Sequence, residues 1–135
     1  MKENQWLSIG QIANISNISV PTVRFYEERQ LIWSTRTSGN QRRYHSSMVR
    51  RIAIIKIAQR VGISLKEVQD IFIDLPKNKS ATKKDWQRMS IKWHEQLNEK
   101  ISSLLLLRDQ LDQCIGCGCL SLKQCPLRNT EAEIV

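Results

Sequence analysis

The four cysteines of this 135-residue chain lie close together in its last quarter, with the spacing C-x2-C-x-C-x5-C. They are Cys114, Cys117, Cys119 and Cys125. Thiolates are soft metal ligands, and four of them within twelve residues can converge on one metal centre. Two glycines between them give the loop the backbone freedom to turn its sulfurs toward a common point. The spacing therefore predicts a metal site.

The spacing leaves the kind of metal centre open. Thioredoxin-type chemistry needs a βαβ context, and c-type haem attachment needs a His where Gly118 stands. Structural zinc sites usually join two separated cysteine pairs, which slightly favours an iron–sulfur cluster over zinc. Disulfides are the remaining alternative. We expect a cytoplasmic protein without a membrane partner, because no segment resembles a membrane span or a signal peptide, and a reducing compartment disfavours disulfides.

The net charge of +8 is concentrated in one segment. Residues 20–60 hold nine Lys and Arg but only two acidic residues, which gives +7. Such a focused positive charge attracts nucleic acid, because Lys and Arg displace the counterions condensed on phosphates. A solvated basic surface without a partner is the alternative.

The elements of this basic segment are those of a DNA reader. Ser8 and Gln11 form a capping box that predicts a helix to about Ile15. Ser19 caps a second helix over residues 20–29, so the two form a helix-turn-helix. Residues 31–33 are β-prone, and a turn at Gly39 and Asn40 separates two potential strands of a small wing.

Further helices follow the wing. Ser46 or Ser47 caps a third helix that ends near Gly62, and Ser64 with Glu67 opens a fourth. After a break at 75–80, residues 82–112 show a seven-residue rhythm. One register holds Ser90, Leu97, Leu104 and Leu111, and the other holds Trp86, Trp93, Lys100 and Leu107. This apolar seam predicts a homodimer, with a helix folded back on its own domain as the alternative.

These elements together predict the fold class and the domains. We expect a mainly α protein: a winged helix-turn-helix DNA-binding domain with a small β-wing, a long dimerisation helix and a C-terminal metal-cluster loop. The expected boundaries are 1–76 for the DNA-binding domain with its second helix pair, 77–112 for the linker and coiled-coil helix, and 113–135 for the cluster loop and tail.

Two motifs resemble those of a known family. The run from Arg24 to Glu27 (RFYE) and the run from Gly39 to Tyr44 (GNQRRY) resemble the N-terminal domain of MerR-type transcription regulators. The cysteine loop resembles that of the redox-sensing members of this family. Gln30 stands where the family often has Gly, so this position is expected to be left-handed or to end the helix differently.

The resemblance implies a regulator, not an enzyme. All four cysteines would hold one 2Fe-2S cluster per subunit, in a homodimer joined by an antiparallel coiled coil. The dimer would bind double-stranded promoter DNA in both redox states. On oxidation by superoxide or redox-cycling compounds it would distort the DNA so that RNA polymerase can engage the promoter.

The residues expected to contact DNA come from the second helix and the wing. They are Thr22, Arg24, Tyr26, Arg36, Gln41, Arg42, Arg43 and Tyr44. Tyr26 and Tyr44 could instead be core aromatics with hydroxyls at the edge. Arg50 and the partner subunit's Trp86 are expected to relay the redox signal, with a solvated helix residue as the alternative for Arg50.

Two rival functions belong to other classes. A cluster-bearing electron carrier would need neither the helix-turn-helix nor the wing, so these elements argue against it. A MerR-type regulator stabilised by zinc, sensing a metal or a small molecule, is the second.

Overall fold

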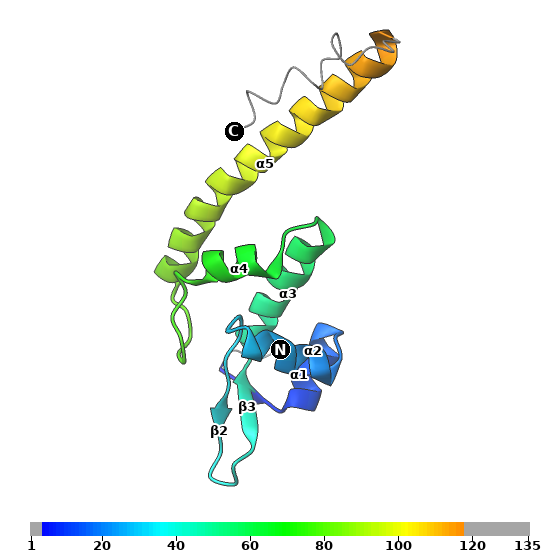
Figure 1. Cartoon of the computed structure of the whole chain (residues 1–135). Coiled ribbons are helices and arrows are strands. Elements are labelled where there is room, and N and C mark those ends of the chain that lie inside the picture. The colour runs from blue at the N-terminus through cyan, green and yellow to red at the C-terminus, as the bar shows by residue number, and fades with distance from the viewer. Residues whose placement is uncertain (1–3, 118–135) are drawn as a thin grey trace. The chain divides into compact units, whose positions relative to one another are not determined.

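The computed structural model describes residues 4–117, and Figure 1 shows a mainly helical chain with a small sheet, as expected. The elements follow in the order β1 (Trp6–Leu7), α1 (Ile9–Ser16), α2 (Val20–Glu28), β2 (Thr35–Arg36), β3 (Arg42–His45), α3 (Met48–Arg60), α4 (Leu65–Phe72) and α5 (Lys83–Cys117). They fall into two units, an N-terminal unit up to Lys92 and a C-terminal unit from Trp93. Helix α5 contributes to both.

Side-chain caps define the helix-turn-helix. Ser8 Oγ accepts a hydrogen bond from the Gln11 N–H at 3.2 Å, and Gln11 Oε1 accepts one from the Ser8 N–H at 2.9 Å. Ser19 Oγ accepts from the Thr22 N–H at 3.2 Å and so caps α2. These bonds satisfy donors that a first helical turn leaves without partners. Both predicted caps are therefore confirmed, and Gln30 is left-handed with φ 62°.

The wing is present, and a third strand joins it. Strand β3 pairs antiparallel with β2, Arg36 opposite Arg42, and also with β1, in the order β1-β3-β2. Asn40, not Gly39, is the left-handed residue of the wing turn, with φ 61°. The sequence did not predict β1. The β-prone residues 31–33 form a buried connection without ladder pairing.

The third and fourth helices confirm the second helix pair. Gly62, with φ 87°, follows the C-terminus of α3, and Ser64 Oγ accepts from the Glu67 N–H at 3.2 Å to begin α4. Ser47 occupies the N-cap position of α3 but makes no capping bond. Its hydroxyl lies 2.7 Å from His45 Nδ1 instead. The prediction of a serine side-chain cap by Ser47 is therefore wrong.

One modest core holds the N-terminal unit together. The largest fully buried side chains come from β1, α1, α2, β3, α3, α4 and the 31–33 connection: Tyr44, Leu7, Ile12, Leu31, Met48, Ile52, Ile55, Ile71, Val23 and Val68. Arg51 is buried beside them and donates to the Pro76 carbonyl at 3.1 Å. Loss of hydration lowers the pKa of this guanidinium to about 10.

Helix α5 begins with a reciprocal cap. Thr82 Oγ1 accepts from the Asp85 N–H at 3.2 Å, while Asp85 Oδ2 accepts from the Thr82 N–H at 2.8 Å. The helix reaches Cys117, the last described residue, and so extends beyond the expected end at 112. In the part of the chain that the structure describes, no helix is long and apolar enough to cross a membrane.

Candidate nucleic-acid interface and cysteine site

Helix α2 presents the first two predicted contacts at its surface. Arg24 is exposed, and Thr22 is half-buried in the first turn, with its hydroxyl 2.7 Å from Ser19 Oγ. Val23 and Tyr26, on the other face, are buried in the core. The core therefore fixes the rotation of α2 about its axis and turns Arg24 outward.

The structure brings Arg24 together with the wing. A surface hollow of about 490 Å³ is lined by the start of α1, by Arg24 and by the wing: Ser8, Ile9, Arg24, Arg36, Asn40, Gln41, Arg42 and Arg43. Four arginines, from α2 and from both strands of the wing, thus line one opening. Guanidinium groups recognise phosphate oxygens through two parallel N–H donors, so this surface suits the backbone of a nucleic acid.

Local hydrogen bonds hold the wing side chains in place. Arg36 Nη1 donates to the Asn40 carbonyl at 3.1 Å and to Asn40 Oδ1 at 3.2 Å. Arg43 Nη2 donates to Gln41 Oε1 at 2.8 Å. These bonds reduce the rotamer entropy that would be lost on binding, because the side chains are partly ordered beforehand.

Glu27 joins α2 to the wing. No role was predicted for this residue from the sequence. Its Oε1 accepts hydrogen bonds from Arg42 Nη1 at 3.1 Å and from the Tyr44 hydroxyl. Its Oε2 accepts one from Ser34 Oγ at 2.6 Å. Attraction by this carboxylate is the main reason that the pKa of Arg42 is raised. The residues that bond to Glu27 lie seven to seventeen positions away from it in the sequence, so no short sequence pattern predicted these bonds.

Tyr26 and Tyr44 lie in the core, the alternative considered for them. Tyr44 is 0% exposed and Tyr26 is 4% exposed. The Tyr26 hydroxyl donates to Gln59 Oε1 at 3.1 Å. Burial, with the hydrogen bond to Glu27, raises the pKa of Tyr44 to about 12. Of the eight predicted DNA contacts, these two therefore lie in the core beneath the candidate interface. The side chains of the other six are exposed or half-buried.

The predicted relay residues lie together within one chain. The Arg50 guanidinium stands 5.2 Å from the centroid of the Trp86 ring, an arrangement in which the ring face attracts the cation. Both residues line a hollow of about 740 Å³. The rest of its lining comes from the residue before β1, the end of β3, the start of α3 and the connection from α4 to α5: Asn4, His45, Ser46, Ser47, Val49, Ala53, Ser80, Ala81 and Lys83. This contact connects the start of α3 to the start of α5.

The structure describes two of the four cysteines within α5. Cys114 is half-buried, and Cys117 is the last residue of the helix. The two cysteines are three positions apart in the sequence, within the last described residues of the chain. Cys119 and Cys125 lie outside the described residues. Within residues 4–117 no group of three or more His, Cys, Asp or Glu forms a metal site.

A helix-turn-helix followed by an arginine-rich wing defines the class of winged helix-turn-helix DNA-binding proteins. Two family models match: "MerR HTH family regulatory protein" over residues 7–74, and "MerR, DNA binding" over residues 49–114. The chain belongs to the MerR family of transcription regulators.

Individual relatives agree with this family. The chain is 43% identical over 129 residues to the "HTH-type transcriptional activator SoxR homolog" of Chromobacterium violaceum, covering 96% of this chain and 87% of that protein. It is 32% identical over 97 residues to the "HTH-type transcriptional regulator TnrA" of Bacillus subtilis, covering 72% and 86%. Such relatives are regulators, which agrees with the expectation that the chain is not an enzyme.

A solved structure shows the same fold. A putative MerR family regulator from Listeria monocytogenes superimposes with a TM-score of 0.55 at 23% identity, covering 96% of this chain and 99% of that one. At this identity the likeness concerns the fold alone.

Proposed function

We propose that the protein is a redox-sensing transcription activator of the cytoplasm, which binds promoter DNA as a homodimer and carries one 2Fe-2S cluster per subunit. The observation that carries the proposal is the similarity to the SoxR homolog over 96% of the chain, which spans both the reader and the cysteine loop. A similarity confined to the reader would support only a DNA-binding regulator.

The arginine hollow supports the DNA-binding part. Arg24 sits on the helix that enters the major groove in helix-turn-helix proteins, and the wing arginines stand beside it around the same hollow. In this arrangement Thr22 and Arg24 would contact the major groove and nearby phosphates. Contacts to the flanking backbone come from the wing through Arg36, Gln41, Arg42 and Arg43.

The C-terminal unit supports dimerisation. Its part of α5 exposes large apolar side chains along the predicted seam, including Leu104 at 64%, Leu107 at 51% and Leu111 at 43%. Exposed leucines repeated over several turns are covered in the antiparallel coiled coil that we propose. Each dimer then carries two readers, which suits a promoter with two half-sites.

The residues present fit an iron–sulfur cluster. Cys114, which is half-buried in α5, and Cys117 supply thiols three positions apart in the sequence, and thiolates are the ligands that such clusters require. Together with Cys119 and Cys125 they would hold the cluster. When bound, the cluster supplies a reversible one-electron change, which superoxide or redox-cycling compounds trigger. The zinc-stabilised regulator has the same fold but lacks this redox change.

We propose that Arg50 and Trp86 of the same subunit, in place of the partner subunit's Trp86, pass the signal on. Their stacked contact joins α5, the helix that carries the first cysteines, to α3, which packs on the reader. We propose that a change at the cysteine loop of either subunit alters this contact and thereby reorients the reader. The bound promoter is then distorted so that RNA polymerase can engage both of its elements.

Two measurements test the proposal. Protein purified without oxygen should be red-brown, contain about two irons and two acid-labile sulfides per chain, and give an electron paramagnetic signal after dithionite reduction. Colourless protein with stoichiometric zinc would overturn the cofactor. In a purified transcription assay, both redox forms should bind the promoter with similar affinity, while the oxidised form alone activates.

A further inference from the structure

The connection between α4 and α5 carries a basic cluster that the proposed function leaves unused. We call residues 77–84 the lysine loop, because they contain Lys77, Lys79, Lys83 and Lys84 and no acidic residue. All four lysines are exposed. Asn78 adopts a left-handed conformation, with φ 62°, and so reverses the chain between the first two.

The neighbouring carboxylates are engaged with other groups. Asp74, before the loop, pairs with Lys92 at 3.5 Å. Asp85, after the loop, accepts from the Thr82 N–H at 2.8 Å and pairs with Arg88 at 3.7 Å. The positive charge of the lysine loop is therefore only weakly offset by its surroundings.

Contacts place the lysine loop beside the base of the wing. Ser80 Oγ lies 3.4 Å from Nδ1 of His45, the last residue of β3. Lys77 and Asn78 line a hollow of about 250 Å³ with Ser34 and Glu27. Glu27 in turn binds Arg42 of the wing, so one residue that lines this hollow bonds to one that lines the arginine hollow.

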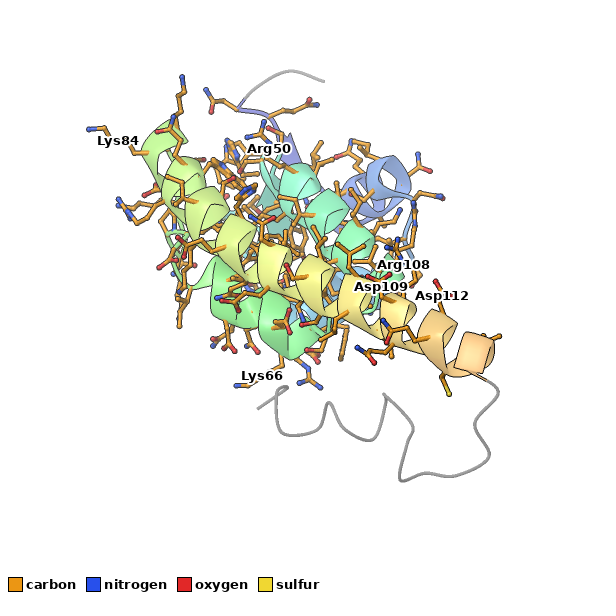
Figure 2. All side chains as sticks on the ribbon, turned by 90° about the horizontal axis from the view of Figure 1, so that it is seen from above. Arg50, Lys66, Lys84, Arg108, Asp109 and Asp112 are labelled. Carbon is orange, nitrogen blue, oxygen red and sulfur yellow. The ribbon has the colours of Figure 1, made fainter. Side chains whose placement is uncertain are left out.

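The pictures agree with this placement. In Figure 1 the loop between α4 and α5 and the β2–β3 wing extend from the same end of the N-terminal unit, opposite the α3–α4 connection. In Figure 2 the Lys84 side chain points outward from the first turn of α5, near Arg50, while Lys66 projects from the other edge of the view.

We propose that the lysine loop is a second contact with the DNA backbone, next to the wing. The inference rests on the proposed DNA binding and extends the footprint of the reader. Lysine is a compact point charge, which suits phosphates and carries no sequence information. The loop therefore adds affinity that does not depend on sequence, and it adds to the number of counterions released on binding.

The test compares two charge-matched double variants of the full-length protein. K77Q/K79Q removes two charges of the lysine loop, and R88Q/K92Q removes two charges that carboxylates already pair. The probe is a labelled duplex selected by the wild-type protein from a random-sequence pool. Its dissociation constant is measured by fluorescence anisotropy at several salt concentrations, and circular dichroism checks that each variant folds.

Each engaged lysine accounts for about 0.9 of the slope of log K against log salt. Because a homodimer carries both substitutions twice, K77Q/K79Q removes four lysines and should lower the slope by up to about 3.6 and weaken binding about tenfold or more. R88Q/K92Q should change the slope by less than about 0.5. Relative affinities for different duplexes should stay the same. Hydroxyl-radical footprinting should show lost protection beside the wing contact.

The outcomes separate this inference from the proposed function. If the wild-type protein selects no duplex, the proposed DNA binding fails, and the inference fails with it. If R42Q/R43Q weakens binding while K77Q/K79Q binds with the wild-type slope, the lysine loop does not contact DNA and only the inference is overturned. An equal loss for K77Q/K79Q and R88Q/K92Q would also overturn it, because net charge alone would then explain the effect.

Discussion

The two units of this chain are stabilised in different ways. The N-terminal unit closes a core of fully buried side chains, from Leu7 in β1 to Val68 and Ile71 in α4. In the C-terminal unit, the described residues form one helix whose leucines from Leu104 to Leu111 are exposed. The first unit therefore buries its own apolar side chains, whereas the second has an exposed apolar face, which the proposed homodimer would cover. Variants that damage one unit and spare the other test this distinction.

The largest effect is expected at the cysteines. Cys114→Ser or Cys117→Ser removes a thiolate ligand, so cluster content and redox-dependent transcription should be lost completely. Promoter binding should stay within about threefold of wild type, because the reader has its own core. Iron analysis and anisotropy measure the two properties. A Cys117→Ser protein that keeps the cluster and its activity would remove that residue from the ligand set.

The second effect concerns the seam. Leu104→Glu with Leu107→Glu places charges on the exposed leucine face, and sedimentation should show monomers. Promoter affinity should fall about a hundredfold or more, because two linked readers bind far more tightly than one. Ser102→Glu, an exposed position off the seam, is the control and should remain dimeric. Dimers formed by the leucine variant would contradict the proposed coiled coil.

The third effect concerns the arginine hollow. Arg24→Ala should weaken promoter binding by about 1 to 3 kcal/mol, while the temperature of unfolding changes little because this side chain is exposed. Arg88→Ala, which removes an exposed arginine of α5 paired with Asp85, is the matched control. Similar losses in the two variants would show that Arg24 acts only through net charge.

The smallest effect is a dependence of stability on pH. The Tyr44 pKa rises from 10.0 to about 12 on folding, so its stabilisation is complete below pH 10 and is lost as the pH rises toward 12. Tyr44→Phe should lose about 1 kcal/mol at neutral pH, with the Glu27 hydrogen bond, and should show a shallower decline above pH 10. Urea unfolding measures both. Parallel declines for the two proteins would contradict the raised pKa.

Local features were predictable from the sequence. Ser8, Ser19 and Ser64 each stand directly before a helix and bond to a backbone N–H three residues later, so short windows contain the whole signal. Gly62 and Gln30 are similarly local, because backbone conformation at a helix end depends on the adjacent turn.

Features that depend on distant partners were missed. Strand β1 is two residues long and pairs with residues almost forty positions away, so no short sequence pattern predicts it. Leu31, Ile32 and Trp33 are β-prone in sequence, but they are buried in a connection without ladder pairing, because an apolar run alone does not distinguish the two. The hydroxyls of Tyr26 and Tyr44 likewise bond to residues far along the chain, Gln59 and Glu27. Ser47 is a local exception, since it bonds to His45 and makes no side-chain cap for α3.

The bonds that Glu27 makes have a mechanical consequence. One carboxylate binds Ser34, Arg42 and Tyr44, so a single side chain joins helix α2 to the wing. In the proposed function these bonds would make the helix and the wing move together. The DNA would then be distorted by a rotation of each whole reader, and not by a shift of the wing against the helix.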